Sequence, residues 1–127
     1  MTPQFEIKKQ ILLLSKEWDD GFAMPDDEDV ESVYDEGMGD WEFEDAKNEI
    51  RCSASNTNLT APNSRHYEPD QVAMKMSSGN WVSWTYWTGG GKHSNPEEID
   101  WISDAFYVDC VEEEKTVVVR TFRKPEQ

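Results

Sequence analysis

The stretch QVAMKMSSGNWVSWTYWT, residues 71–88, determines the fold that we predict for the second half of the chain. It contains two runs typical of β-strands, Gln71–Met76 and Trp81–Thr88. Ser78-Gly79 between them is a turn sequence, because glycine readily adopts the backbone conformations that tight turns require. We therefore predict an antiparallel hairpin at residues 71–88.

A second hairpin is predicted downstream. Phe106–Val111 and Thr116–Phe122 are again β-rich and are joined by a short polar connection. Between the two hairpins, Asn95 is a good helix cap and Pro96 suits the first position of a short helix. The second half of the chain is thus predicted to be a four-strand antiparallel meander with one inserted short helix.

The first half carries helical patterns. Thr2 followed by Pro3 is typical of a helix start, and Gly21 is expected to end the helix in a left-handed conformation. Between them, apolar side chains recur at the spacing of one helix face, at Ile7, Ile11, Leu14 and Trp18.

Two shorter helices are expected next. Pro25 opens PDDEDVESVYDEG (residues 25–37), whose early acids favour a helix N-terminus. Asp40 can cap WEFEDAKNEIRC (residues 41–52), although a strand is the alternative for this segment. The polar residues 53–65 read as a surface loop.

Helices followed by antiparallel strands indicate an α+β fold. Residues 1–127 match the size of a single domain, in which residues 1–52 are mainly helical and acidic and residues 66–124 mainly sheet.

Charge is the outstanding property of the composition. The chain has 27 acidic and 12 basic residues, for a formal net charge of −15. Residues 17–49 alone hold 15 of the acids and a single base, Lys47. So many negative charges close together repel one another and reduce folding stability. Solubility by itself is therefore a weak explanation for this stretch of acids.

We interpret these acids as a substitute for nucleic-acid phosphates. Duplex DNA carries roughly one charge per 1.7 Å of its axis, and acids three or four residues apart on a helix lie about 5–6 Å from one another, so rows of such acids could approximate a line of phosphates. Two such rows are Asp27, Glu31, Asp35 and Glu42, Asp45, Glu49. The full set of partner-binding candidates is Asp19, Asp20, Asp26, Asp27, Glu28, Asp29, Glu31, Asp35, Glu36, Asp40, Glu42, Glu44, Asp45 and Glu49.

The same acids have two other interpretations. They can form a solvated surface that keeps the chain in solution. They can also bind a divalent cation, but no window matches the ligand spacing of a calcium-binding EF-hand loop, so no metal site is expected.

A secondary candidate patch lies in the second half of the chain. Trp84 and Tyr86 share one face of a predicted strand, and Trp81 and Trp87 point the other way. Either one pair fills the core while the other is covered by the loop or by the 96–104 helix, or an exposed aromatic patch anchors a partner. The following GGGKH places Lys92 and His93 in a glycine-rich loop that could hold a phosphate, although it matches no established nucleotide-binding motif.

Histidine and cysteine give no further site. His66, His93, Cys52 and Cys110 lack the paired spacing of zinc ligands, so no cofactor is expected. We expect both cysteines to be unbonded and partly buried. The N-terminal apolar run is too short for a signal peptide or a membrane span, which favours the cytoplasm.

The function favoured by these patterns is that of a non-enzymatic interaction protein. It would bind a basic, nucleic-acid-binding protein and inhibit it by DNA or RNA mimicry, as an anti-restriction or anti-CRISPR protein of a phage would, without binding nucleic acid or membrane itself. The alternatives are a small enzyme or ligand-binding domain with its site at Gly89–His93, and an acidic subunit of a larger assembly.

Overall fold

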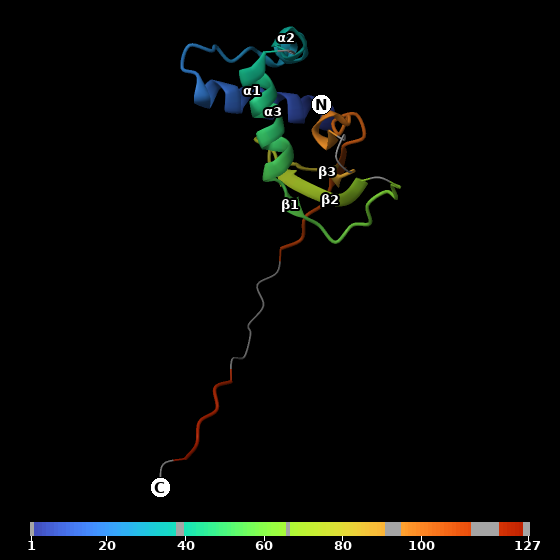
Figure 1. The fold of residues 1–127 in the computed structure, drawn as a ribbon. Helices are drawn as coiled ribbons and strands as arrows, with labels where there is room; N and C mark the ends of the chain where they lie inside the picture. Colours follow the sequence, from blue (N-terminus) through green and yellow to red (C-terminus); the bar gives the residue numbers. More distant parts are fainter. Residues whose placement is uncertain (1, 38–39, 66, 91–94, 113–119, 126–127) are drawn as a thin grey trace.

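The computed structural model describes residues 2–37, 40–65, 67–90, 95–112 and 120–125 (Figure 1). Over these residues the fold is α+β, with three helices that precede a four-strand antiparallel sheet. In chain order the elements are α1 (Pro3–Trp18), a 3-10 turn η1 (Asp27–Asp29), α2 (Val30–Gly37), α3 (Trp41–Ser53), β1 (Ser55–Asn56), β2 (Tyr67–Lys75), β3 (Trp81–Gly89), a 3-10 turn η2 (Pro96–Glu98) and β4 (Phe106–Val108).

The predicted hairpin at residues 71–88 is confirmed and forms the centre of the sheet. β2 and β3 pair from Lys75 opposite Trp81 to Tyr67 opposite Gly89. The turn between them closes with a hydrogen bond from the Met76 N–H to the Asn80 carbonyl at 2.8 Å. Gly79 has φ of +94°, which explains why glycine stands in this turn.

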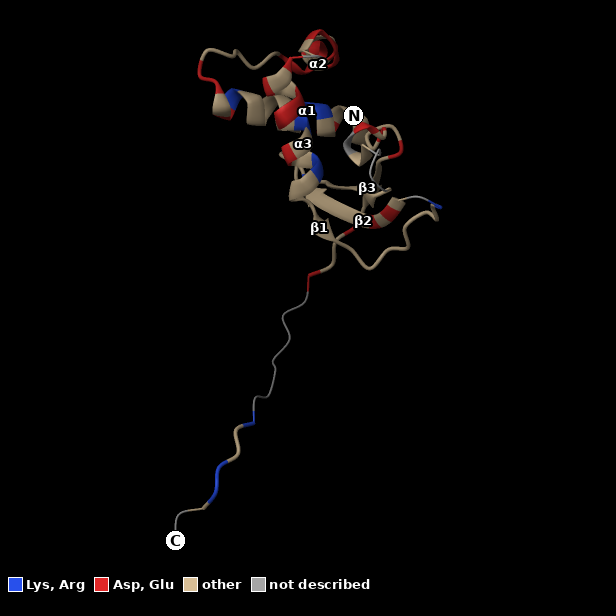
Figure 2. Cartoon of the chain, viewed as in Figure 1, with Lys and Arg blue, Asp and Glu red and all other residues tan. Residues whose placement is uncertain are grey.

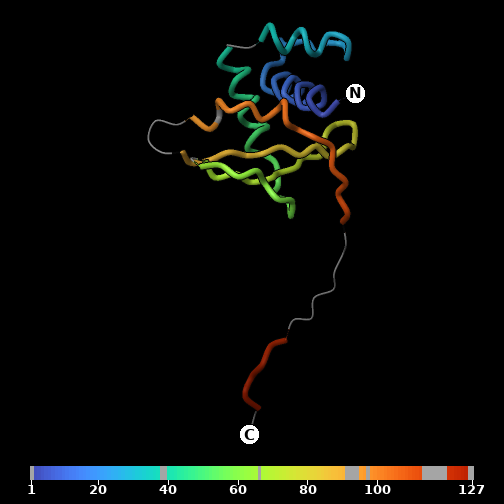
Figure 3. Tube along the Cα trace, turned by 90° about the vertical axis from the view of Figure 1, so that its right-hand side faces the viewer, coloured from blue at the N-terminus to red at the C-terminus, as the bar shows by residue number. Residues whose placement is uncertain are grey.

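The two edge strands differ from the prediction. β1 lies in the segment that we expected to be a loop, because Ser55 and Asn56 pair with the edge of β2 in spite of their polar character. β4 has only three residues. Of the expected strand Thr116–Phe122, residues 116–119 lie outside the described residues, and residues 120–122 are exposed, form no strand and lie away from the folded body (Figures 1 and 3).

Two helix starts follow their predicted caps, whereas the helix predicted to open at Pro25 begins only at Val30, after the 3-10 turn η1. The Thr2 hydroxyl accepts a hydrogen bond from the Phe5 N–H at 3.1 Å. The Asp40 carboxylate accepts one from the Glu42 N–H at 3.0 Å, and residues 41–52 are helix rather than strand. The predicted end of α1 is wrong in its mechanism, because Gly21 is not in the left-handed region. Instead, Asp19 caps the helix with extended backbone, and its side chain accepts the Gly21 N–H at 2.9 Å.

The core lies between the helices and one face of the sheet (Figure 3). At its centre the indoles of Trp84 and Trp101 lie 5.0 Å apart, centroid to centroid. The buried apolar side chains that surround them come from all three helices and both central strands and include Ile7, Ile11, Leu12, Val30, Phe43, Ala46, Ile50, Val72 and Val82. Burying these surfaces is the main contribution that stabilises the fold.

A buried cation connects α3 to β3. Arg51, near the end of α3, is only 6% exposed. Its guanidinium donates a hydrogen bond to the Trp87 carbonyl at 2.5 Å and lies 4.6 Å from the centroid of the Tyr86 ring. Trp87 lies beyond the part of β3 that pairs with β4, so Arg51 supplies a donor where the sheet has none.

Within the described ranges, no helix combines the length and the apolar character needed to cross a membrane.

Candidate interaction surface

The acidic side chains of residues 17–49 are all exposed, as so many carboxylates with few cations among them require. They line the outside of the helical half, where Figure 2 shows red over η1, α2 and α3. The set comprises Glu17, Asp19, Asp20, Asp26, Asp27, Glu28, Asp29, Glu31, Asp35, Glu36, Asp40, Glu42, Glu44, Asp45 and Glu49.

Two of these carboxylates are paired with lysines of α1. The Asp27 carboxylate lies 2.9 Å from the Lys9 ammonium, and that of Glu31 lies 3.7 Å from the Lys8 ammonium. Both belong to the first of the two predicted rows, which is therefore partly neutralised from within the fold. In the part of the chain that the structure describes, the second row, Glu42, Asp45 and Glu49, forms no ion pair.

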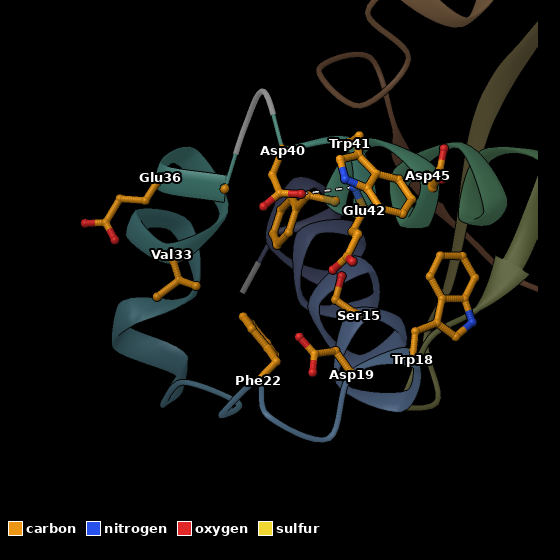
Figure 4. Close-up of a pocket in the computed structure, with 12 residues that line it drawn as sticks. Ser15, Trp18, Asp19, Phe22, Val33, Glu36, Asp40, Trp41, Glu42 and Asp45 are labelled. Atoms are coloured by element: carbon orange, nitrogen blue, oxygen red, sulfur yellow. Dashed lines mark hydrogen bonds between the residues drawn. The ribbon is translucent and has the colours of Figure 1, made fainter.

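A second group of acids surrounds a cavity. The ends of α1 and α2 and the start of α3 enclose a hollow of about 650 Å³ (Figure 4). Its acidic lining residues are Asp19, Glu36, Asp40, Glu42 and Asp45, and its apolar and aromatic ones are Trp18, Phe22, Val33, Trp41 and Phe43. We call this hollow the acidic–aromatic cavity.

Close packing between α2 and α3 shapes one side of this cavity. Gly37 ends α2 against the ring of Phe43, and a β-carbon at residue 37 would lie 2.9 Å from three of the ring carbons. Only glycine lets the two helices approach this closely. Trp41, at the first position of α3, lines the same cavity.

Sequence reasoning missed both tryptophans of the cavity. The helical spacing predicts Trp18 on the buried stripe of α1, but its side chain is 52% exposed. The stripe is fully buried only as far as Ile11, and Leu14 is already partly exposed. Trp41 was not singled out, and it is 71% exposed. The signal that could have found it is its position outside the buried spacing Phe43, Ala46, Ile50 of the same helix.

The aromatic run of β3 is not one exposed patch. Trp84 is fully buried, and Tyr86 packs against the core on the same face of the sheet. Trp81 and Trp87 lie on the opposite face and are partly covered. Trp87 also makes an edge-on contact with Tyr67 at 6.3 Å between centroids. The interpretation in which one set fills the core is therefore correct for Trp84, and this residue is unavailable to a partner.

The glycine-rich loop is described only at its start. Gly89 and Gly90 have φ of +76° and +91°, values that favour glycine. Lys92 and His93 lie outside the described residues, so the proposed phosphate site at Gly89–His93 stays a prediction.

Cysteine and metal chemistry can be followed only in part. Cys52 and Cys110 are free, but both are exposed, so the expected partial burial is wrong. Cys52 lies at the end of α3, and its hydrogen bond with the Tyr86 hydroxyl raises the pKa of Tyr86.

Among the residues described, no three His, Cys, Asp or Glu side chains are grouped as a metal site would need. His66 and His93 lie outside that set.

The acidic–aromatic cavity and the exposed carboxylates around it are thus the candidate interaction surface. Comparison with protein families, with curated proteins and with solved structures finds no match, so the function of this surface is argued from its own residues.

Proposed function

We propose that this chain is a non-enzymatic inhibitor that binds a basic, nucleic-acid-binding protein and competes with its nucleic acid. The observation that carries the proposal is the exposure of every carboxylate of residues 17–49, five of which surround one cavity. Carboxylates held on a rigid surface resemble the phosphates that such a partner normally binds. The same charge disfavours nucleic acid as a direct ligand.

The α3 side is the stronger candidate for the mimicking surface. Glu42, Asp45 and Glu49 lie at helical spacing and are unpaired among the described residues, whereas Asp27 and Glu31 already bind lysines. An unpaired carboxylate keeps its full charge for a partner. A reducing cytoplasm and an origin in a phage or other mobile element, acting against a host defence nuclease, suit a small protein of this kind.

Capture and displacement test this function. The immobilised chain is exposed at low salt to an extract of the cell that encodes it, and bound proteins are eluted at high salt. At least one eluted protein should bind labelled duplex DNA or RNA, and the free chain should displace that nucleic acid in competition. Because the attraction is electrostatic, the apparent affinity should fall steeply as salt rises.

Two matched triple variants make the test specific. Glu36→Lys, Glu42→Lys and Asp45→Lys reverse three exposed charges of the candidate surface, and displacement should weaken at least about tenfold. Glu68→Lys, Asp104→Lys and Asp109→Lys make the same change in net charge on the sheet half and should act much less. Equal losses in both variants, or captured proteins that bind no nucleic acid, contradict the proposal.

A further inference from the structure

We propose that the acidic–aromatic cavity receives an arginine side chain of the basic partner, with the guanidinium stacked on Trp41 and paired with the carboxylates of the rim. This inference rests on the proposed function and specifies how the partner is recognised. It makes the cavity an anchor point within a wider surface of carboxylates.

The exposed tryptophans are the first observation. An indole is the largest apolar side chain, and leaving one mostly in water forgoes stabilisation that burial would give. Here Trp18 and Trp41 border the same cavity from α1 and α3 (Figure 4). Exposed tryptophans beside a hollow are typical of the residues that contribute most to binding a protein partner.

The orientation of the acids is the second observation. Glu42 extends from the start of α3 toward Ser15 on α1, and Asp19 projects into the cavity from the end of α1 (Figure 4). Asp19 and Asp40 are each held by a backbone N–H, which uses one acceptor site and leaves others open. Within the described ranges, none of the acids of this cavity forms an ion pair.

Part of the cavity lining is apolar. Phe22, Val33 and Phe43 contribute to it and are less exposed than the acids that line the same cavity. An arginine matches this arrangement, since its aliphatic stem can lie on apolar side chains while its planar head stacks on an indole and donates to carboxylates. The head group is also more weakly hydrated than an ammonium, so it loses less on entering the cavity. A lysine could satisfy the rim but would gain less from the aromatic face.

Defined peptides test the assignment without knowledge of the natural partner. The probes are two dodecapeptides of equal charge, one alternating glycine with arginine and the other glycine with lysine. Both should bind the chain with an affinity that falls as salt rises. The arginine peptide should bind about fivefold more tightly, the ratio that corresponds to ~1 kcal/mol of cation–π attraction.

The decisive variant is Trp41→Ala, which leaves the net charge unchanged. The preference for arginine should disappear while the affinity for the lysine peptide is retained. Trp41→Leu, which keeps an apolar side chain without the aromatic face, should behave in the same way. Phe106→Ala removes an exposed aromatic residue from β4 and serves as the matched control, which should keep the preference.

The site of binding is checked separately by the NMR signals of the indole N–H groups. Those of Trp18 and Trp41 should shift with the arginine peptide, and that of the buried Trp84 should not. Equal affinities for the two peptides, or a preference that survives Trp41→Ala, overturn the cavity assignment alone. Failure of both peptides to bind contradicts the proposed function as well.

Discussion

The carboxylate of Glu6, in the first turns of α1, accepts hydrogen bonds from the Ser78 hydroxyl and, at 3.3 Å, from the side-chain amide of Asn80. Both donors lie in the turn between β2 and β3, so this one side chain fastens the first helix to the central hairpin. Burial by itself would raise the pKa of Glu6, but hydrogen bonds from Ser78, Tyr107 and Asn80 outweigh it and hold the pKa below its ordinary value.

Glu6→Gln should therefore reduce stability in a pH-dependent way. At pH 7 we expect a loss of about 1–3 kcal/mol, because a buried charged hydrogen-bond acceptor is replaced. A lowered pKa in the folded state contributes stability that is present above the ordinary value of 4.5 and is lost as the pH falls through the folded value. The difference between the two proteins should shrink accordingly in urea unfolding from pH 7 to pH 3.

The comparison needs a control for net charge, because protonation also relieves repulsion among the surface acids. Glu17→Gln makes the same substitution at an exposed position and should change stability by less than ~0.5 kcal/mol. A Glu6→Gln protein that matches this control at every pH would contradict the structural role of the Glu6 hydrogen bonds.

Gly37→Ala tests the contact that shapes the acidic–aromatic cavity. Alanine in a helix is favoured over glycine by about 1 kcal/mol, but crowding of a packed ring costs about 1–3 kcal/mol. We expect a net loss of ~1 kcal/mol in chemical denaturation, with Phe43 displaced. Gly37→Ala should cost less in a Phe43→Leu background, where there is no ring to displace. Additive effects of the two substitutions would contradict the contact.

The sequence predicts features that depend on neighbouring residues better than features that depend on residues far along the chain. Thr2 and Asp40 cap their own helices, and Ser78-Gly79 forms the turn of its own hairpin. The local sequence was therefore enough to predict them. β1 was missed because its pairing depends on Val72 and Ala73, far along the chain. Local propensity carries no information about such a partner.

The candidate surface was predictable in its charge but not in its shape. The exposure of the acids follows from their number and the scarcity of bases. The cavity depends on how three helix ends meet, and that arrangement also decides that Trp18 and Trp41 are exposed whereas Trp84 is buried. Periodicity assigns a residue to a face of its helix, but it does not say where along the helix the core ends.

A chain that ends at Glu112 should remain as stable as the full one. The described residues beyond β4, 109–112 and 120–125, are all exposed and belong to no helix or strand. We expect the midpoint of thermal unfolding to change by less than ~3 °C. A chain that ends at Ala105 also loses β4 and the hydrogen bond of Tyr107 to Glu6, and it should unfold at a clearly lower temperature. Marked destabilisation of the chain that ends at Glu112 would contradict this expectation and would indicate that residues beyond Glu112 contribute to the fold.

Arg51→Lys should destabilise the fold although it keeps the charge. The guanidinium reaches the Trp87 carbonyl while lying against Tyr86, and an ammonium is more strongly hydrated and cannot stack in the same way. We expect a loss of about 1–3 kcal/mol in chemical denaturation. The opposite exchange at a half-buried neighbour, Lys47→Arg, should be nearly neutral. Similar stabilities for the two variants would contradict the role of Arg51.

Arg51 has a wider consequence for a chain of net charge −15. It forms no ion pair among the described residues, but three acids, Glu44, Asp45 and Glu98, line the same hollow of about 460 Å³ together with Lys47. A buried cation that hydrogen-bonds to neutral groups but has no carboxylate partner is stabilised by the summed negative potential around it. The acids that line this hollow contribute to that potential, so replacing them with neutral residues should weaken the attachment of α3 to the sheet through Arg51.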